Sequence, residues 1–289
     1  MPRIAYVNGR YVPHAEAAVH IEDRGYQFAD GVYEVVPVFR GQMVDEELHL
    51  DRLERSLSEL RIEMPMSRQA LRMITAEVMR RNRLDNGFVY MQITRGVAPR
   101  DHKFPKHAKP AVVMSVRQTK LHGDEAIHDG VKVVTQPDLR WARRDIKSVS
   151  LLPNCLAKQS AHEAGASEAW LVEEDGTITE GTSTNAWILT EDNKLVTRKA
   201  DSSILNGITR VSLIKCAEAK GIAFEERPFT PEEAYRAREA FLTSSSNFVM
   251  PVTEIDGRTI GHGHAGLLTL KLRQAYVDSV ATPGKRSRD

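Results

Sequence analysis

The first part of the chain alternates apolar and polar residues with two different periods. Leucines recur every three or four residues between Leu50 and Leu60, which predicts an amphipathic helix over 46–60. The same spacing predicts a second helix over 70–81. Short apolar runs predict strands, the first folded into a hairpin at Asn8-Gly9, over residues 4–12, 32–39, 88–94 and 111–117.

Helices and strands are also mixed in the second part of the chain. Short strands are predicted over 131–135, 169–173, 177–179, 186–189, 194–197 and 240–242. Helices are predicted between and after them, over 151–163, 208–219, 232–237 and 267–280. The class is therefore α/β (α+β), with both kinds of element in each part.

The polar stretch LHGDEAIHDG, which begins at Leu121, is the best candidate for a connection between two domains. We expect a small N-terminal domain over 1–120, a link over 121–129 and a larger domain over 130–289. A chain of 289 residues is long enough for two modest domains, each with a core. Residues 282–289 are expected to form a frayed tail.

Composition excludes several classes of protein. The chain has 40 basic and 39 acidic residues, which gives a formal net charge of +1. This balance argues against a broad nucleic-acid-binding surface and against an acidic disordered chain. Two cysteines cannot build a disulfide framework and are typical of a reducing compartment. Neither a signal peptide nor an apolar run of membrane length is found. We expect a cytoplasmic protein without a membrane or nucleic-acid partner.

Several polar segments could carry chemistry, although each alone has an ordinary structural explanation. Lys147 stands in a basic segment that could simply be a solvated edge of the protein. It has close apolar neighbours, however, and burial among them would lower its pKa and favour the neutral, nucleophilic amine. Glu180 opens a turn of small polar residues. Gly207 precedes a predicted helix whose first amides could bind a phosphate. A hydroxyl-rich turn follows over 243–247. The pair His262 and His264 lacks a third ligand nearby in sequence, so no metal site is expected.

The order of these segments suits pyridoxal 5′-phosphate. A lysine can form a Schiff base, a carboxylate can pair with the pyridine nitrogen, and a helix start can bind the phosphate. The chain also carries a long gapped signature that resembles that of the fold-type-IV pyridoxal-phosphate aminotransferases. It consists of Glu180-Gly181-Thr182-Ser183-Thr184-Asn185-Ala186-Trp187, Leu195-Val196-Thr197 and Leu205-Asn206-Gly207-Ile208-Thr209-Arg210.

Further segments resemble the branch of this family that acts on D-amino acids. They are the run from Asp23 to Val36, Thr94-Arg95-Gly96 with Pro99-Arg100-Asp101-His102, and Asp145-Ile146-Lys147-Ser148. The resemblance implies a small α/β domain and a larger domain with a barrel-like sheet. It also implies a homodimer with a shared active site, because the arginine and histidine that bind substrate come from the partner subunit in this family.

The resemblance assigns a role to each matching residue. Lys147 would form the Schiff base and then carry the proton, and Glu180 would hold the pyridine nitrogen protonated. Phosphate contacts are implied for Arg52, Ile208, Thr209 and Ser245. Contacts with the ring are implied for Leu205 and Ser244. Binding of the substrate carboxylate is implied for Tyr33, Arg100 and His102.

The expected function is ping-pong transamination of D-amino acids, for example D-alanine and 2-oxoglutarate to pyruvate and D-glutamate. Three activities of the same fold remain open: a branched-chain L-amino-acid transaminase, an (R)-amine transaminase and aminodeoxychorismate lyase. Branched-chain members commonly carry Phe-Glu-Gly where this chain has Tyr33-Glu34-Val35. A non-catalytic protein that binds a phosphorylated metabolite is the alternative of a different class.

Overall fold

The computed structural model describes residues 3–119 and 123–281. The chain forms two compact units. Unit 1 comprises Met1–Lys120 and Ile146–Ser150, and unit 2 comprises Leu121–Asp145 and Leu151–Asp289. The junction at residues 120–121 and the tail at 282–289 lie outside the described residues. The rest of the predicted link contains a short helix, α4 (Asp124–Asp129). The side chain of Ile127 from this helix is buried in the core of unit 2.

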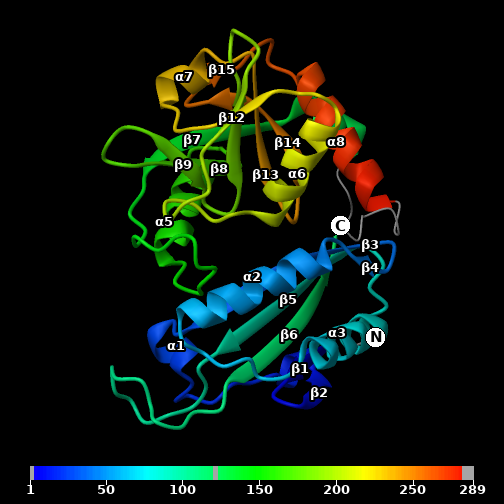
Figure 1. Ribbon diagram of the computed structural model, residues 1–289, viewed down its shortest axis with the longest axis vertical. Coiled ribbons are helices and arrows are strands. Elements are labelled where there is room, and N and C mark those ends of the chain that lie inside the picture. Colours follow the sequence, from blue (N-terminus) through cyan, green and yellow to red (C-terminus); the bar gives the residue numbers. More distant parts are fainter. Residues whose placement is uncertain (1–2, 120–122, 282–289) are drawn as a thin grey trace. The chain divides into compact units, whose positions relative to one another are not determined.

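Unit 1 is built on a six-stranded sheet in which all neighbouring strands are antiparallel. Its order is β2 (Arg10–Pro13), β1 (Ile4–Val7), β6 (Ala111–Gln118), β5 (Gly87–Thr94), β3 (Gly31–Phe39) and β4 (Gln42–Met43). Helix α2 (Glu46–Glu59) packs on β3, and α3 (Arg68–Asn82) packs on β1 and β6 (Figure 1). The predicted leucine stripe explains this packing, since Leu53 and Leu57 are fully buried in the core.

Unit 2 contains a nine-stranded mixed sheet. Its path is β12 (Phe224–Glu226), β11 (Leu195–Thr197), β10 (Asn185–Leu189), β13 (Glu239–Ser244), β14 (Phe248–Ile255), β7 (Val131–Pro137), β8 (Glu168–Val172) and β9 (Ile178–Gly181), with β15 (Arg258–Thr259) on β14. Strand β9 also contacts β10, so the sheet curls on itself. The predicted barrel-like sheet and the mixed α/β class are confirmed.

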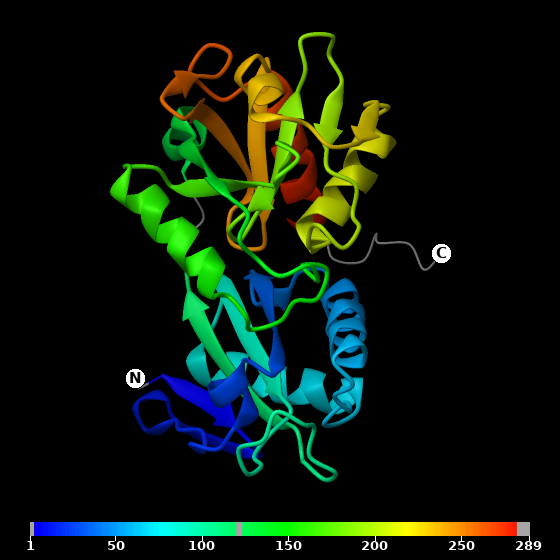
Figure 2. The same cartoon turned by 90° about the vertical axis from the view of Figure 1, so that its left-hand side faces the viewer.

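Helices cover this curled sheet. Helix α6 (Ile208–Ala219) and α8 (Leu267–Ala281) lie side by side and pack on β13 and β14, as Figure 2 shows in yellow and red. Helix α5 (Leu152–Glu163) packs on β7 and β8, and α7 (Pro231–Tyr235) begins with a proline. Within 3–119 and 123–281, no helix combines the length and the apolar character needed to cross a membrane.

Several elements escaped the sequence analysis, and two of them, α1 (Arg24–Phe28) and β14, show why. Helix α1 has only five residues, and Asp23 caps it by accepting a hydrogen bond from the amide of Gly25 at 2.8 Å. Strand β14 contains Pro251, which argues against a central strand because proline has no N–H to donate. The strand nevertheless pairs with β13 on one side and with β7 on the other.

Candidate functional site

The start of α6 in unit 2 is shaped for an anion. Gly207 is the N-cap and offers no side chain to the first turn, and its carbonyl accepts the first helical bond from the amide of Val211 at 2.9 Å. A Cβ atom at Gly207 would lie 2.1 Å from Oδ1 of Asn185, so only glycine fits. The first amides of a helix have no partner within the helix and carry the positive end of its dipole. Ile208 and Thr209, both buried, occupy this first turn.

A second loop of unit 2 lies near the same position. Asn185 pairs with Thr243 in the sheet, and its side-chain amide donates to the carbonyl of Leu205 at 2.9 Å. Ser244 and Ser245 directly follow Thr243 and are half-buried. The hydroxyl of Ser244 accepts from the amide of Asn247 at 3.1 Å, which fixes the turn. The turn of Ser244 and Ser245 therefore follows the strand position that faces Asn185, and Asn185 in turn contacts the segment before α6.

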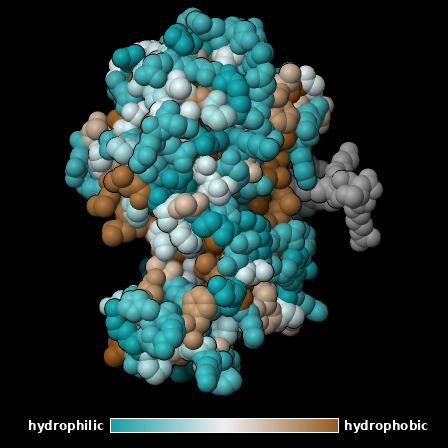
Figure 3. All heavy atoms as spheres, turned by 60° about the vertical axis from the view of Figure 1, so that its left-hand side comes forward, coloured by the Kyte–Doolittle hydropathy of each residue, from teal (hydrophilic) through white to brown (hydrophobic). Residues whose placement is uncertain are grey.

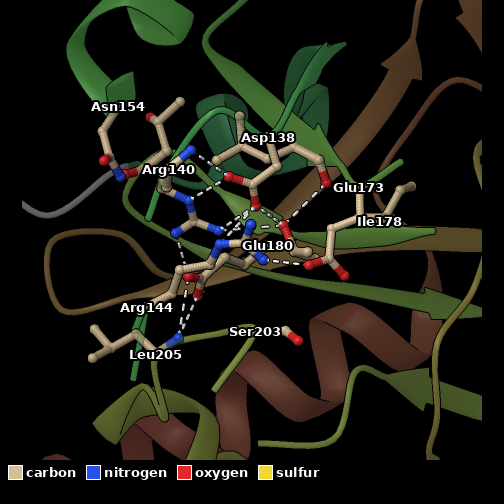
Figure 4. Close-up of polar contacts among 12 residues, drawn as sticks. Asp138, Arg140, Arg144, Asn154, Glu173, Ile178, Glu180, Ser203 and Leu205 are labelled. Atoms are coloured by element: carbon tan, nitrogen blue, oxygen red, sulfur yellow. Dashed lines mark hydrogen bonds and ion pairs between the residues drawn. The ribbon is translucent and has the colours of Figure 1, made fainter. Parts of the chain in front are cut away.

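Glu180 is the buried carboxylate of this region, 4% exposed at the end of β9 (Figure 4). The side-chain amide of Asn185 donates to it at 2.9 Å, and the backbone amide of Leu205 lies 3.1 Å from both of its oxygens. Arg140 donates to its Oε1 at 2.6 Å. Burial nevertheless raises the pKa of Glu180, and the charge of Arg140 only partly offsets that effect.

Arg140 divides its guanidinium between two carboxylates, which explains this weak compensation. Nε and Nη2 donate to Asp138 at 2.9 and 2.8 Å, and only Nη1 reaches Glu180 (Figure 4). Asp138 also raises the pKa of Glu180 through its own charge. The sequence analysis missed Arg140, because it stands among 40 basic residues. The Asp-x-Arg spacing at the end of β7 was the available signal.

A second buried carboxylate, Glu168, supports the polar turn that follows Glu180. It accepts from the amide of Ala169 at 2.9 Å and from the hydroxyl of Thr182, and Lys158 lies 3.3 Å away. Glu168 is 2% exposed, so the turn packs against a buried carboxylate and not against solvent. This residue too was missed, because nothing in its local sequence distinguishes it from a surface glutamate.

Lys147 belongs to unit 1, although the residues before and after its segment in the sequence belong to unit 2. The segment lies antiparallel to the start of β3, with a bridge between Val32 and Ser148. The amide of Tyr33 donates to the carbonyl of Lys147 at 3.0 Å, which ties the lysine backbone to the sheet. Nζ of Lys147 lies 4.2 Å from the centre of the Tyr33 ring. A lysine ammonium at this distance is attracted to the face of an aromatic ring.

Arg52 lies buried on α2, where it forms a two-pronged pair with Glu34 of β3. Nε and Nη2 each donate to a different oxygen of Glu34 at 2.8 Å. His49 lies 2.7 Å from the same carboxylate through Nδ1. Burial alone would raise the pKa of Glu34, but Arg52 and His49 hold it well below its usual range. The sequence analysis identified Arg52 but neither of these partners.

Tyr33 and the loop that carries Arg100 and His102 have different neighbours in the described structure. Tyr33 contacts Lys147 and Tyr90, the latter at 5.8 Å between ring centres. Arg100 and His102 are exposed and lie against Phe28, at 4.6 and 5.4 Å from its ring centre. All of these contacts are between residues of one chain.

A buried arginine anchors the loop of Arg100 and His102. Arg24 donates to the carbonyl of Asp101 at 2.6 Å and to Asp30 at 2.8 Å. Arg95 donates to both oxygens of Asp30, at 2.7 and 2.9 Å. The loop therefore starts from a rigid, charge-paired base, which the motif from Asp23 to Asp30 supplies.

The predicted site residues thus fall into two sets. Unit 2 holds those expected around the ring and the phosphate: Glu180, Leu205, Ile208, Thr209, Ser244 and Ser245. Unit 1 holds the nucleophile, the arginine of α2 and the residues expected at the substrate carboxylate: Lys147, Arg52, Tyr33, Arg100 and His102.

Comparison with known proteins gives consistent matches over nearly the whole chain. The model of the family described as amino-transferase class IV matches residues 31–255. A D-alanine aminotransferase from Bacillus licheniformis is 41% identical over 273 residues, which are 94% of this chain and 95% of that protein. One from Listeria monocytogenes serotype 4b (strain F2365) is 38% identical over 276 residues, 95% of each chain.

Solved structures match the fold closely. A branched-chain amino acid aminotransferase from T.th. with pyridoxamine 5′-phosphate has a TM-score of 0.89 and 26% identity, covering 97% of this chain and 94% of that one. A branched-chain aminotransferase from Escherichia coli also has a TM-score of 0.89, at 23% identity, covering 99% and 98%. The latter likeness concerns the fold alone.

Proposed function

The chain belongs to amino-transferase class IV, and we propose that it transfers amino groups between D-amino acids and 2-oxo acids with pyridoxal 5′-phosphate. The observation that carries the proposal is the environment of Glu180. It is buried, receives one nitrogen of a shared arginine, and has a raised pKa. Such a carboxylate favours a further cationic partner, and a protonated pyridine nitrogen is that kind of group.

The residues of unit 2 fit this cofactor. At Gly207 there is no room for a Cβ atom, and the first turn of α6 offers amides to a phosphate. Glu180 suits the opposite, basic end of the cofactor ring. When bound, the cofactor supplies an electron sink for the bond broken at the substrate Cα. Ile208, Thr209, Ser245 and Arg52 would hold the phosphate. Leu205 and Ser244 would flank the ring.

Lys147 would hold the cofactor covalently through Nζ and, once displaced by substrate, move the proton at Cα. Three contacts support this role by fixing the lysine backbone: the bond to Tyr33, the bridge at Ser148, and a bond of 3.3 Å from its own amide to Ser56 Oγ. A flexible side chain on a fixed backbone can take and return a proton over a short path.

Borohydride reduction of the purified holoenzyme tests this assignment. Reduction followed by peptide mapping should label Lys147. Lys147→Ala should lose the label and about 10⁴-fold or more of the activity, because nucleophile and proton carrier are removed together. Lys158→Ala is the matched control, a lysine whose Nζ contacts Glu168 instead, and it should keep the label. Label on Lys158 or Lys199 in the wild type would refute the assignment.

The D-amino acid is distinguished by where its carboxylate binds. Tyr33, Arg100 and His102 would receive it, so that the Cα hydrogen faces Lys147 in only one enantiomer. A guanidinium binds a carboxylate through two parallel hydrogen bonds. The exposed position of Arg100 and His102 on an anchored loop supports a role toward a second subunit, and we include a homodimer with a shared site in the proposal.

Exposed apolar side chains near this loop support the same dimer. Val19, Ile21, Tyr26 and Val97 are 42–76% exposed in unit 1. Brown apolar patches interrupt the hydrophilic surface in Figure 3. Neither Cys155 nor Cys216 forms a disulfide, which fits a cytoplasmic enzyme. Sedimentation of the purified chain as a monomer at assay concentration would contradict the dimer.

A branched-chain L-transaminase is the second candidate, because the solved structures described above carry that activity in their names. Specificity constants for D-alanine, L-leucine and an (R)-amine separate the two. Arg100→Ala should lower the constant for D-alanine by ~10- to 150-fold, the equivalent of about 1.5–3 kcal/mol for a charge-assisted contact. The amine has no carboxylate and should change little. A wild type that prefers L-leucine to every D-amino acid would establish the second candidate.

A further inference from the structure

A cluster of two histidines and an aspartate in unit 2 lies outside the residues of the candidate site. His264 follows β15, in a segment whose sequence offers only His262 as a neighbour of the same kind. The fold brings His128 and Asp129 of α4 beside it. One ligand atom from each of the three residues lies within 4.8 Å of the other two. All three side chains are exposed.

Sheet pairing explains how these distant segments meet. Strand β7 follows α4 and runs parallel to β14, with Val131 opposite Val252, and β14 leads into the β15 turn. Two hydrogen bonds then fix the backbone of the cluster. The amide of Ala265 donates to the carbonyl of His128 at 2.9 Å, and the hydroxyl of Thr253 donates to the carbonyl of Asp129 at 2.9 Å. The relative position of the three backbone segments is therefore set by the sheet and these bonds.

The side-chain geometry is close to that of a ligand set. The rings of His128 and His264 are stacked, with centres 4.7 Å apart and planes 29° apart. Nδ1 of His128 lies 3.5 Å from Oδ1 of Asp129. Ligands at about 2.0–2.2 Å from a tetrahedral zinc ion stand roughly 3.3 Å from one another. Rotation of exposed side chains alone can close the remaining difference, with the backbone in place.

We propose that His128, Asp129 and His264 form a binding site for a divalent transition-metal ion of the zinc class. Two imidazoles and one carboxylate match the ligand preference of Zn²⁺, Co²⁺ and Ni²⁺, whereas Mg²⁺ and Ca²⁺ prefer oxygen ligands alone. Solvent completes the coordination. The ion links the C-terminal end of α4 to the segment that leads into α8, so it stabilises unit 2 and takes no part in transamination.

Calorimetric titration of the full chain with Zn²⁺ tests the site. The wild type should bind one equivalent, and H128A and H264A should each weaken this binding at least ~10-fold, since even the outer partners of metal ligands contribute ~10–100-fold. H262A is the matched control. It removes a histidine from the same glycine-rich segment, two residues from His264 and outside the cluster, and should leave the affinity unchanged.

Two further measurements complete the test. The thermal unfolding midpoint should rise with Zn²⁺ in the wild type and H262A but not in H128A or H264A, because a ligand of the folded state stabilises it by mass action. Mg²⁺ at the same concentrations should have no effect. The proposal is overturned if the wild type binds no Zn²⁺ saturably, if H128A and H264A bind it as tightly as the wild type, or if H262A loses as much affinity as H264A.

Discussion

Glu34 in unit 1 and Glu180 in unit 2 are both buried carboxylates paired with an arginine, yet their pKa values shift in opposite directions. Glu34 is 1% exposed and its pKa is lowered, whereas Glu180 is 4% exposed and its pKa is raised. Burial acts in the same direction on both, because it disfavours the charged form. The opposite outcomes must therefore come from the neighbouring charges.

The difference lies in how fully an arginine serves each carboxylate. Both oxygens of Glu34 accept from Arg52, and the ring of His49 adds a hydrogen bond. Glu180 receives one nitrogen of Arg140, which gives its other two contacts to Asp138. Glu34 is thus fully compensated within unit 1 and has a structural role. Glu180 is only partly compensated, as expected of a group that acquires another cation when the protein functions.

Removing the charge of Glu34 should have the largest effect on stability. Glu34→Gln leaves the buried Arg52 without its counter-charge, and breaking a buried pair in this way costs about 3–5 kcal/mol. Unfolding by denaturant measures the loss. Glu54→Gln, on the helix that carries Arg52, is the control, because the pairing of Glu54 with Arg68 is partly exposed and should contribute less than about 1 kcal/mol. Equal losses in the two variants would remove the distinction drawn for Glu34.

The charge of Glu180 should matter for the reaction more than for the fold. Glu180→Gln keeps the shape of the side chain but removes the partner of a protonated ring nitrogen. We expect activity to fall by about 10²–10³-fold, the usual cost of losing one group that stabilises transition-state charge. Stopped-flow measurement of the half-reaction with D-alanine gives the rate. Glu168→Gln, at another buried carboxylate of unit 2, should reduce stability more than rate. An unchanged rate in Glu180→Gln would make Glu180 a turn residue only.

His49 provides the smallest effect and separates charge from burial in unit 1. Burial lowers the pKa of His49 from its usual 6.5, so the folded state stays neutral while the unfolded chain takes up a proton. The unfolded state then binds more protons, and stability falls as the pH drops below 6.5. The slope should reach up to ~1.4 kcal/mol per pH unit.

The difference between the unfolding free energies of the wild type and His49→Gln, measured from pH 6.5 to 4.5, isolates this contribution, because Glu180, whose pKa is raised, contributes to both curves and Glu34 contributes only below its usual value of 4.5. His49→Gln should flatten the curve in this range. His102→Gln, at an exposed histidine, should leave it unchanged. Parallel curves for the wild type and His49→Gln would show that another group titrates there.

Local patterns predicted much of the fold. The leucine spacing identified α2, and glycine as N-cap with glycine after the last turn identified α6 at its observed bounds, Ile208–Ala219. Periodicity could not reveal β14, because Pro251 removes a donor from a strand that is held by its hairpin partner β13 on one side and by long-range pairing with β7 on the other. Such pairing depends on residues far away in sequence, which a local pattern does not record.

The candidate site was predicted only as far as a linear signature reaches. Glu180 and Gly207 belong to one continuous motif and were found together. Arg140 and Asp138 precede that motif by many residues, and their effect on Glu180 depends on how β7 and β9 are placed by β8 between them. The return of residues 146–150 to unit 1 was likewise hidden, since their contacts are with β3 and α2.

That return has a consequence for recombination between related enzymes. The polypeptide enters unit 1 twice, first for its sheet and helices and then for five residues that carry Lys147. A chimaera joined once, near residue 120, would take the lysine from one parent and the strand that receives it, from Gly31 to Tyr33, from the other. Exchange of the whole of unit 1 instead needs three junctions, the second and third at Ile146 and Ser150.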